Sequence, residues 1–175
     1  MLHVDRMRDS IRYYDGEGLL PLLDEGGRSM FAYWKELKGD GPFPAKPDFD
    51  PMRVPRALPG IQIVEAVGKP DEFIYRLVGT REVAARGWDP TGKPIVDGFI
   101  GPSADVVLKH YRQTIENAVP LGVTGIFRLY SGIWKEDISL FLPMADKSGK
   151  LTFVFVYSYQ KPLPEGDKDQ HDQQS

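Results

Sequence analysis

The side chains best suited to binding chemistry in this 175-residue sequence are one histidine and three arginines. His110 lies next to Tyr111 in a segment with helical spacing of apolar residues. Arg76, Arg81 and Arg128 carry guanidinium groups, which offer paired N–H donors to a carboxylate or a phosphate. Arginines at strand positions also form ordinary surface ion pairs, and a lone helical histidine is often structural. These residues indicate a binding site rather than a reaction centre.

No set of side chains in the sequence has the pattern of a catalytic centre. Glu136 and Asp137 are adjacent on a predicted strand, so their side chains point to opposite faces and make a poor acid–base pair. The other histidines, His3 and His171, lie near the chain ends. The sequence has no Ser-His-Asp arrangement, P-loop, GxGxxG or HExxH motif, and no cysteine. We therefore expect a protein that is not an enzyme and has no metal site.

Composition excludes several other classes. The net charge is -3, with basic residues interspersed among acidic ones, so no basic face is available for a phosphate backbone. No apolar run approaches the length of a membrane span, and the first residues lack the apolar core of a signal peptide. We expect a cytoplasmic protein that binds neither nucleic acid nor membrane.

Proline and glycine residues, which interrupt helices and strands, divide the chain into segments. Residues 1–27 form a mixed N-terminal extension, and residues 161–175 are polar and predicted to be a disordered tail. Residues 28–38 form a predicted amphipathic helix, with Met30 and Trp34 on its apolar face. The connector 39–60 holds six prolines, too many for regular structure. The predicted domain proper is residues 61–160.

Within that domain the pattern predicts two strands, then helices, then three strands. The predicted strands are 61–67, 72–78, 121–130, 133–144 and 151–159. A short helix is expected at 81–86 with Thr80 as its N-cap, and a longer one at 103–119. This order predicts an α+β fold: a five-stranded antiparallel sheet with helices on one face and a pocket between them.

Several words of the sequence resemble a bacterial PAS-like domain family. They are YW in the first helix, DFDP and VPRALP in the connector, YRLVGT at the end of the second strand, and the GxDxTG pattern of GWDPTG. The resemblance covers residues 28–160. It implies a PAS fold and a sensory or protein-interaction role. Haem-binding PAS proteins carry their ligand on the helix corresponding to 103–119, and His110 lies about one turn from that position.

We predict a non-catalytic PAS-like sensory or interaction module that binds a small molecule between sheet and helices. Residues at strand ends and on the helix face are expected to converge there; they are Leu77, Thr80, Trp88, Val107, His110, Tyr111 and Trp134. A protein partner and a homodimer are expected for signal output, and the sequence names no cofactor. The alternatives are a small enzyme of the ketosteroid-isomerase-like cone type and a haem-binding sensor.

The last predicted strand, LTFVFVYSY, is apolar on both faces. Phe155 and Tyr157 share one face, and Val154 and Val156 share the other. A half-exposed antiparallel strand would alternate with polar residues, so something must cover its outer side. The helix 28–38 is the predicted cover, from this chain or from a neighbouring one.

Overall fold

The computed structural model describes residues 2–69 and 71–163. The helices are α1 (Leu2–Ser10), α2 (Gly16–Leu19), α3 (Glu25–Lys38), α4 (Thr80–Arg86), α5 (Ile95–Gly98) and α6 (Ala104–Asn117). The strands are β1 (Arg12–Asp15), β2 (Ile61–Ala66), β3 (Phe73–Val78), β4 (Leu121–Arg128), β5 (Trp134–Ala145) and β6 (Leu151–Pro162). The 3-10 turns are Leu20–Leu22, Lys46–Asp48, Pro51–Arg53 and Leu58–Gly60.

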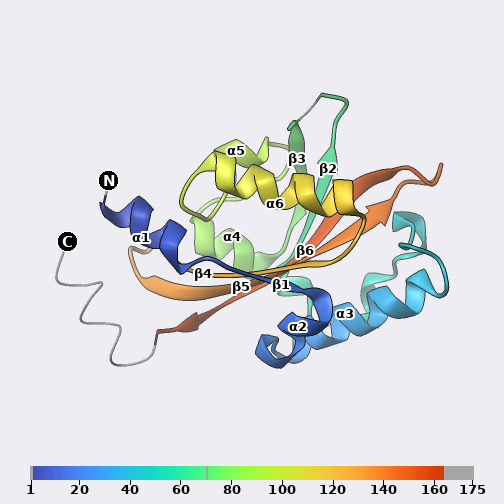
Figure 1. Cartoon of the computed structure of the whole chain (residues 1–175), viewed down its shortest axis with the longest axis horizontal. Coiled ribbons are helices and arrows are strands. Elements are labelled where there is room, and N and C mark those ends of the chain that lie inside the picture. The colour runs from blue at the N-terminus through green and yellow to red at the C-terminus, as the bar shows by residue number, and fades with distance from the viewer. Residues whose placement is uncertain (1, 70, 164–175) are drawn as a thin grey trace.

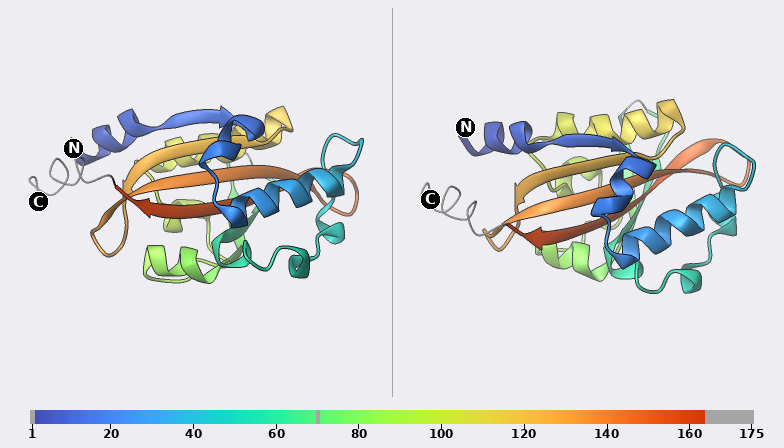
Figure 2. Two further views of the ribbon diagram at one scale, coloured as in Figure 1. Left: turned by 90° about the horizontal axis from the view of Figure 1, so that it is seen from below. Right: turned by 60° about the horizontal axis from the view of Figure 1, so that its bottom comes forward.

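The strands form one antiparallel sheet in the order β1-β4-β5-β6-β2-β3. The expected α+β fold is confirmed, but the sheet has six strands rather than five. The added strand is β1, from the predicted N-terminal extension, and Arg12 pairs with Thr124 at the free edge of β4. Figure 2 shows this N-terminal strand in blue beside β4. The extension is therefore part of the sheet.

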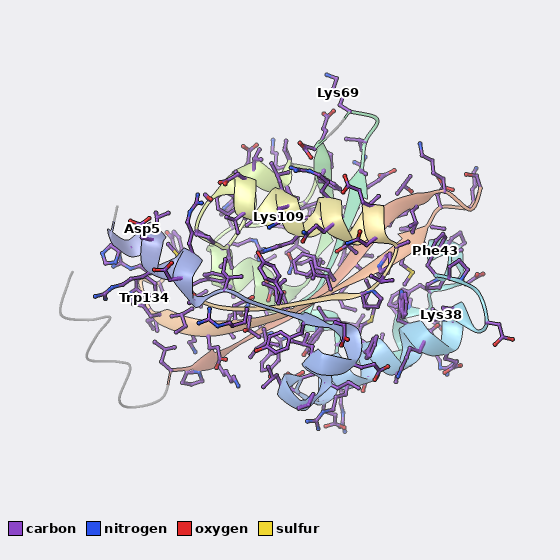
Figure 3. The ribbon with its side chains drawn as sticks, viewed as in Figure 1. Asp5, Lys38, Phe43, Lys69, Lys109 and Trp134 are labelled. Carbon is purple, nitrogen blue, oxygen red and sulfur yellow. The ribbon has the colours of Figure 1, made fainter. Side chains whose placement is uncertain are left out.

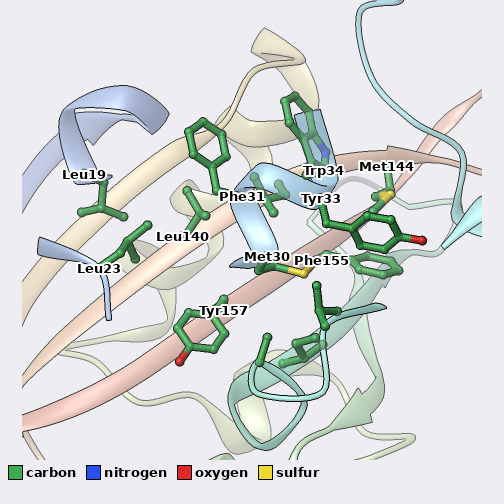
Figure 4. Packing of buried hydrophobic residues seen from close by; sticks show 14 of the residues in the cluster. Leu19, Leu23, Met30, Phe31, Tyr33, Trp34, Leu140, Met144, Phe155 and Tyr157 are labelled. Carbon is green, nitrogen blue, oxygen red and sulfur yellow. The ribbon is translucent and has the colours of Figure 1, made fainter. Parts of the chain in front are cut away.

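Helices lie on both faces of the sheet, α6 on one and α3 on the other (Figure 1), and each face has its own apolar core. On the face toward α6, here called the inner face, Val154 and Val156 pack with Tyr111. On the opposite or outer face, Phe155 and Tyr157 pack beneath α3, as Figure 4 shows. Helices thus cover both faces, not one. The two-sided apolar pattern of the last strand is explained by α3, which docks on the sheet of its own chain.

The boundaries of two elements differ from those expected. α3 begins at Glu25 rather than residue 28, because the carboxylate of Asp24 caps it by accepting from the backbone N–H of Gly27 at 2.9 Å. α4 has Gly79 at its N-cap position, and Thr80 is its first helical residue, so the predicted Thr80 cap is wrong. β6 continues to Pro162, and the predicted disordered tail beyond residue 163 lies outside the described residues.

Among the described residues, no helix combines the length and the apolar character needed to cross a membrane.

Candidate functional site

A small cavity of about 40 Å³ lies between α6 and the inner face of the sheet. The residues around it come from α4, α6, the 99–102 segment and the five strands β2 to β6; they are Gln62, Tyr75, Glu82, Arg86, Phe99, Ile100, Gly101, Pro102, Val107, His110, Tyr111, Val123, Phe127, Asp137, Ser139, Phe141, Val156 and Ser158. Space for one water takes roughly 10–15 Å³ in such a measure, so the cavity has room for a few non-hydrogen atoms. Its walls are apolar at the α6 end and polar at the α4 end.

The polar end is organised by a buried ion pair on α4. Glu82 and Arg86 are one helical turn apart, and Arg86 Nη1 donates to Glu82 Oε2 at 2.8 Å. Both side chains are almost completely buried. Arg86 Nε donates to the carbonyl oxygen of Gly98 at 2.6 Å, which ties α4 to the end of α5. A buried ion pair needs such additional hydrogen bonds to offset the loss of hydration.

Two strands extend this pair into a network. Arg86 Nη2 donates to Gln62 Oε1 on β2 at 3.0 Å, and Gln62 Nε2 reaches Ser158 on β6 at 3.2 Å. The hydroxyl groups of Ser158 and Ser139 lie 2.7 Å apart. These serines are direct cross-strand partners in the ladder between β5 and β6, so strand register brings them together.

The same ladder places a second carboxyl group in the network. Asp137 lies opposite Gln160, and Gln160 Nε2 donates to Asp137 Oδ1 at 2.7 Å and to Glu82 Oε1 at 3.1 Å. Ser139 donates to Asp137 Oδ2 at 2.7 Å. One amide group therefore bridges two buried carboxyl groups.

Burial raises the pKa of both carboxyl groups. For Glu82, loss of hydration is the largest cause; Arg86 opposes it, and the nearby Asp137 adds to it. For Asp137, loss of hydration again dominates and raises the pKa, against hydrogen bonds from Gln160 and Ser139. The cluster holds two carboxyl groups and one guanidinium, so its acidic charge exceeds its basic charge. A raised pKa on both acids is the expected response.

α6 supplies the other polar atoms of the cavity wall. Tyr111 is only 3% exposed, and within the part of the chain that the structure describes its hydroxyl group has no hydrogen-bond partner. Its electrostatic coupling to Tyr75, Glu82 and Asp137 places it near the polar end. His110 Nε2 lies 3.2 Å from the hydroxyl of Tyr13 on β1. Among the described residues the fully buried polar atoms without a partner are Arg81 Nε and Thr152 Oγ1, so the Tyr111 hydroxyl oxygen keeps some accessible surface and can hydrogen-bond to a molecule in the cavity.

Three of the seven predicted site residues meet at this cavity. Val107, His110 and Tyr111 lie on the face of α6 that packs against the sheet, and all three line the space. Whether they bind a ligand stays a prediction.

The other four residues do not converge there. A register shift opposite Ile63 makes Arg76 an extra residue in β3, so Leu77 faces the outer side and is 45% exposed. Thr80 is exposed on α4. Trp88 is 42% exposed and lines a separate outer hollow. Trp134 is buried against His3 of α1, far from α6 in Figure 3, with ring centroids 5.6 Å apart.

The network at the polar end was missed by sequence reasoning. Glu136 and Asp137 are excluded above as an acid–base pair, and in the structure Glu136 pairs with Lys161 whereas Asp137 joins the network. The sequence does contain an indication of the network. Asp137 and Ser139 occupy alternate positions of β5, just before its apolar second half, which places two polar groups on one buried face.

The three arginines singled out earlier have local partners. Arg76 donates to Glu65 at 2.6 Å, Arg81 donates to the carbonyl oxygen of Ser158 at 2.6 Å, and Arg128 Nε donates to the carbonyl oxygen of Gly132 at 3.1 Å. Arg76 therefore forms the surface ion pair considered from its sequence position.

The pH dependence of stability should report on His110. Burial, with a smaller effect of Lys109, lowers the pKa of His110 from 6.5 to about 4. Between these values the unfolded chain binds a proton that the folded chain excludes, so the free energy of unfolding falls as the pH drops from 6.5 to 4. Over this pH range the free energy of unfolding of the wild-type protein should fall by roughly 3 kcal/mol more than that of His110→Gln. Urea unfolding at several pH values measures both.

The comparison with His110→Gln isolates the imidazole. Glu82 and Asp137 have raised pKa values, so acidification acts on them in the opposite direction. They are present in both proteins, and their effect cancels in the difference between the two curves. Parallel curves for the two proteins would show that His110 is not held neutral by burial.

Among residues 2–69 and 71–163 no group of three or more His, Cys, Asp or Glu side chains is placed to hold a metal ion. His110 also fits haem poorly, because its Nε2 is engaged by Tyr13 and the cavity of about 40 Å³ is much smaller than a porphyrin.

Comparison with solved structures finds the same architecture in VqmA. The structure of the Vibrio cholerae VqmA dimer in the absence of target DNA matches with a TM-score of 0.52 at 16% identity, over 63% of this chain and 50% of that chain. VqmA bound to DPO matches with a TM-score of 0.52 at 18% identity, over 65% and 57% of the two chains. This chain thus spans about half the length of these structures. At such identities the likeness concerns the fold alone.

No curated protein matches the sequence. A family model described as PAS domain matches residues 24–155, from the cap of α3 to the middle of β6. That span includes α3, the strands β2 to β5 and the first part of β6, together with every residue of the cavity wall except Val156 and Ser158. The chain belongs to the PAS domain family.

Proposed function

We propose that this PAS domain is a non-catalytic sensory module whose signal is a small molecule bound in the cavity between α6 and the sheet. The observation that carries the proposal is the Tyr111 side chain, which is 3% exposed, lines the cavity and carries a hydroxyl group with no hydrogen-bond partner among the described residues. A bound molecule would supply the missing hydrogen bond. The neighbouring carboxyl groups and guanidinium provide further polar contacts, and apolar walls exclude water, as in most small-molecule sites.

Binding at this position has a route to the surface. His110 lines the cavity and also contacts Tyr13 on β1. A movement of α6 would therefore displace β1 at the edge of the sheet. The signal then leaves by contact of the N-terminal segment with a partner protein or with a second copy of the chain.

Native mass spectrometry of freshly purified protein tests the proposal. We expect a mass adduct on the wild-type protein that is lost in Tyr111→Phe, because this change removes the hydroxyl and keeps the ring that packs against Phe73 and Phe141. Tyr14→Phe is the matched control, since it also removes one tyrosine hydroxyl and Tyr14 packs on the outer face of the sheet, away from the cavity. Equal adducts on all three proteins, or wild-type protein that takes up nothing from a cell metabolite extract, would contradict the proposal.

The enzyme alternative of the ketosteroid-isomerase type loses its main support. Element order in the structure is that of a PAS domain, with the helices α4 to α6 inserted between the pair β2 and β3 and the three strands β4 to β6 of the same sheet. The buried carboxyl groups would suit acid–base chemistry, but both accept hydrogen bonds from the amide of Gln160 at a cavity of about 40 Å³. A sensory role requires only binding.

A further inference from the structure

The hydrogen-bonding capacity that remains unused in the cavity belongs mainly to acceptor atoms, which would bind a donor. Arg86 uses Nε on Gly98, Nη1 on Glu82 and Nη2 on Gln62, which leaves one N–H of Nη2 without a partner among the described residues. An anion entering the cavity would therefore meet no unpaired cation. It would meet two carboxyl groups instead.

Asp137 has the largest unused capacity. Each of its oxygens accepts one hydrogen bond in the described structure, from Gln160 and from Ser139, whereas a carboxylate accepts about four. It has no ion pair among the described residues; Arg86 and Arg81 act on it only from a distance. Glu82 is more fully used, because it accepts from Arg86, Gln62 and Gln160.

The Tyr111 hydroxyl is the second, independent observation. The Tyr111 side chain is 3% exposed and lines the same cavity as Asp137, and its hydroxyl group lacks a partner within the described residues. A hydroxyl group can accept a hydrogen bond as well as donate one. Two acceptors thus face a space of about 40 Å³ whose wall is polar toward α4 and otherwise apolar.

We propose that the group bound in this cavity is a hydrogen-bond donor, a cationic amine or a neutral amide, held by the carboxyl group of Asp137 and the hydroxyl of Tyr111. This inference rests on the proposed function and adds the chemical class of the ligand. An amine would also balance the excess of acidic groups over Arg86, and carboxylate ligands are disfavoured at the same site.

A hollow next to the cavity offers room for the rest of a larger ligand. An outer hollow of about 260 Å³ lies beyond the segment 99–101, and it shares Arg86, Phe99, Ile100 and Gly101 with the inner cavity. Trp88 and Tyr130 line the hollow from outside. A donor group in the inner cavity can therefore continue into an apolar or aromatic body in the hollow, once the 99–101 segment moves aside.

Three probes of similar size test the chemical class: methylammonium, acetamide and acetate, each titrated at pH 7 and constant ionic strength. A molecule that binds the folded state alone raises the melting temperature. We expect methylammonium and acetamide to raise it and acetate to leave it unchanged. Asp137→Asn should weaken the methylammonium response at least tenfold, and Tyr111→Phe should weaken the acetamide response. Tyr14→Phe is the control variant, because Tyr14 packs on the outer face of the sheet and lines neither the cavity nor the hollow, and it should respond as wild type.

The outcomes separate this inference from the proposed function. An equal response to acetate, no response to any probe, or responses unchanged in both Asp137→Asn and Tyr111→Phe would overturn the donor class. Should Asp137→Asn fail to fold, Tyr111→Phe alone decides. An anionic adduct in native mass spectrometry, lost in Tyr111→Phe, would overturn the donor class and still support a sensory cavity. Absence of any adduct would contradict the proposed function itself.

Discussion

Replacing Trp34 by alanine is expected to lower the free energy of unfolding by about 3–5 kcal/mol. The side chain is 3% exposed, stacks on Phe31 with ring centroids 6.2 Å apart, and lies between α3 and the outer face of the sheet. Its indole Nε1 donates to the carbonyl oxygen of Pro143 at 3.0 Å, so alanine leaves both a void and an unpaired buried carbonyl. Urea unfolding monitored by circular dichroism measures the loss.

Two variants control for the tryptophan change. Trp34→Phe keeps most of the ring volume and removes only the hydrogen bond, so its loss should be about 1–2 kcal/mol. Trp88→Ala removes a tryptophan that is 42% exposed, and it should change the free energy of unfolding by about 1 kcal/mol or less. A Trp34→Ala protein as stable as Trp88→Ala would mean that α3 does not hold the outer face.

The docking of α3 is the feature that sequence reasoning predicted best. Phe155 and Tyr157 alternate with Val154 and Val156, so apolar side chains point to both faces of β6. This pattern predicts that both faces are buried, whichever strands pair with β6. Helical spacing in residues 28–38 then supplied the cover. Both arguments use only the spacing of residues within one strand or one helix, which does not depend on how the elements are arranged in the fold.

The sixth strand and the face to which Leu77 points cannot be predicted from the local sequence pattern. β1 is four residues long, mostly exposed and without alternation, and only the free edge of β4 makes it a strand. The two residues Tyr75 and Leu77 should share a face by period 2, but the extra residue Arg76 turns Leu77 to the other side. A β-bulge of this kind depends on register with the partner strand.

The polar network depends on register even more strongly. Gln62, Asp137 and Gln160 lie on three different strands, and Glu82 lies on a helix, so no spacing along the chain brings them together. Their proximity follows from the order β5-β6-β2 within the sheet and from the docking of α4 against it. Once the topology is known, buried polar residues at alternate strand positions point to the cluster.

Replacing Arg86 by methionine is expected to lower the free energy of unfolding by about 3–5 kcal/mol at pH 7, because Glu82 is left buried without a counter-ion. Adding Glu82→Gln should restore much of this loss, since the uncompensated charge is then gone. Lys35→Met removes one partner of the exposed pair with Glu17, and it should change stability by less than about 1 kcal/mol. Urea unfolding of the four proteins gives the comparison.

The effect of pH on the Arg86→Met variant distinguishes charge from shape. Burial already raises the pKa of Glu82 against the opposing effect of Arg86, so removing the guanidinium raises this pKa further. A carboxyl group with a raised folded pKa favours the folded state at low pH, and this contribution is lost as the pH rises through that pKa. The difference in the free energy of unfolding between wild type and Arg86→Met should therefore narrow from pH 7 to pH 5.

A difference that stays constant with pH, together with no rescue by Glu82→Gln, would show that the loss of stability comes from the packing of the Arg86 side chain and its hydrogen bond to Gly98. In that case the polar end of the cavity is a structural brace, and its acidic excess is not what selects a ligand.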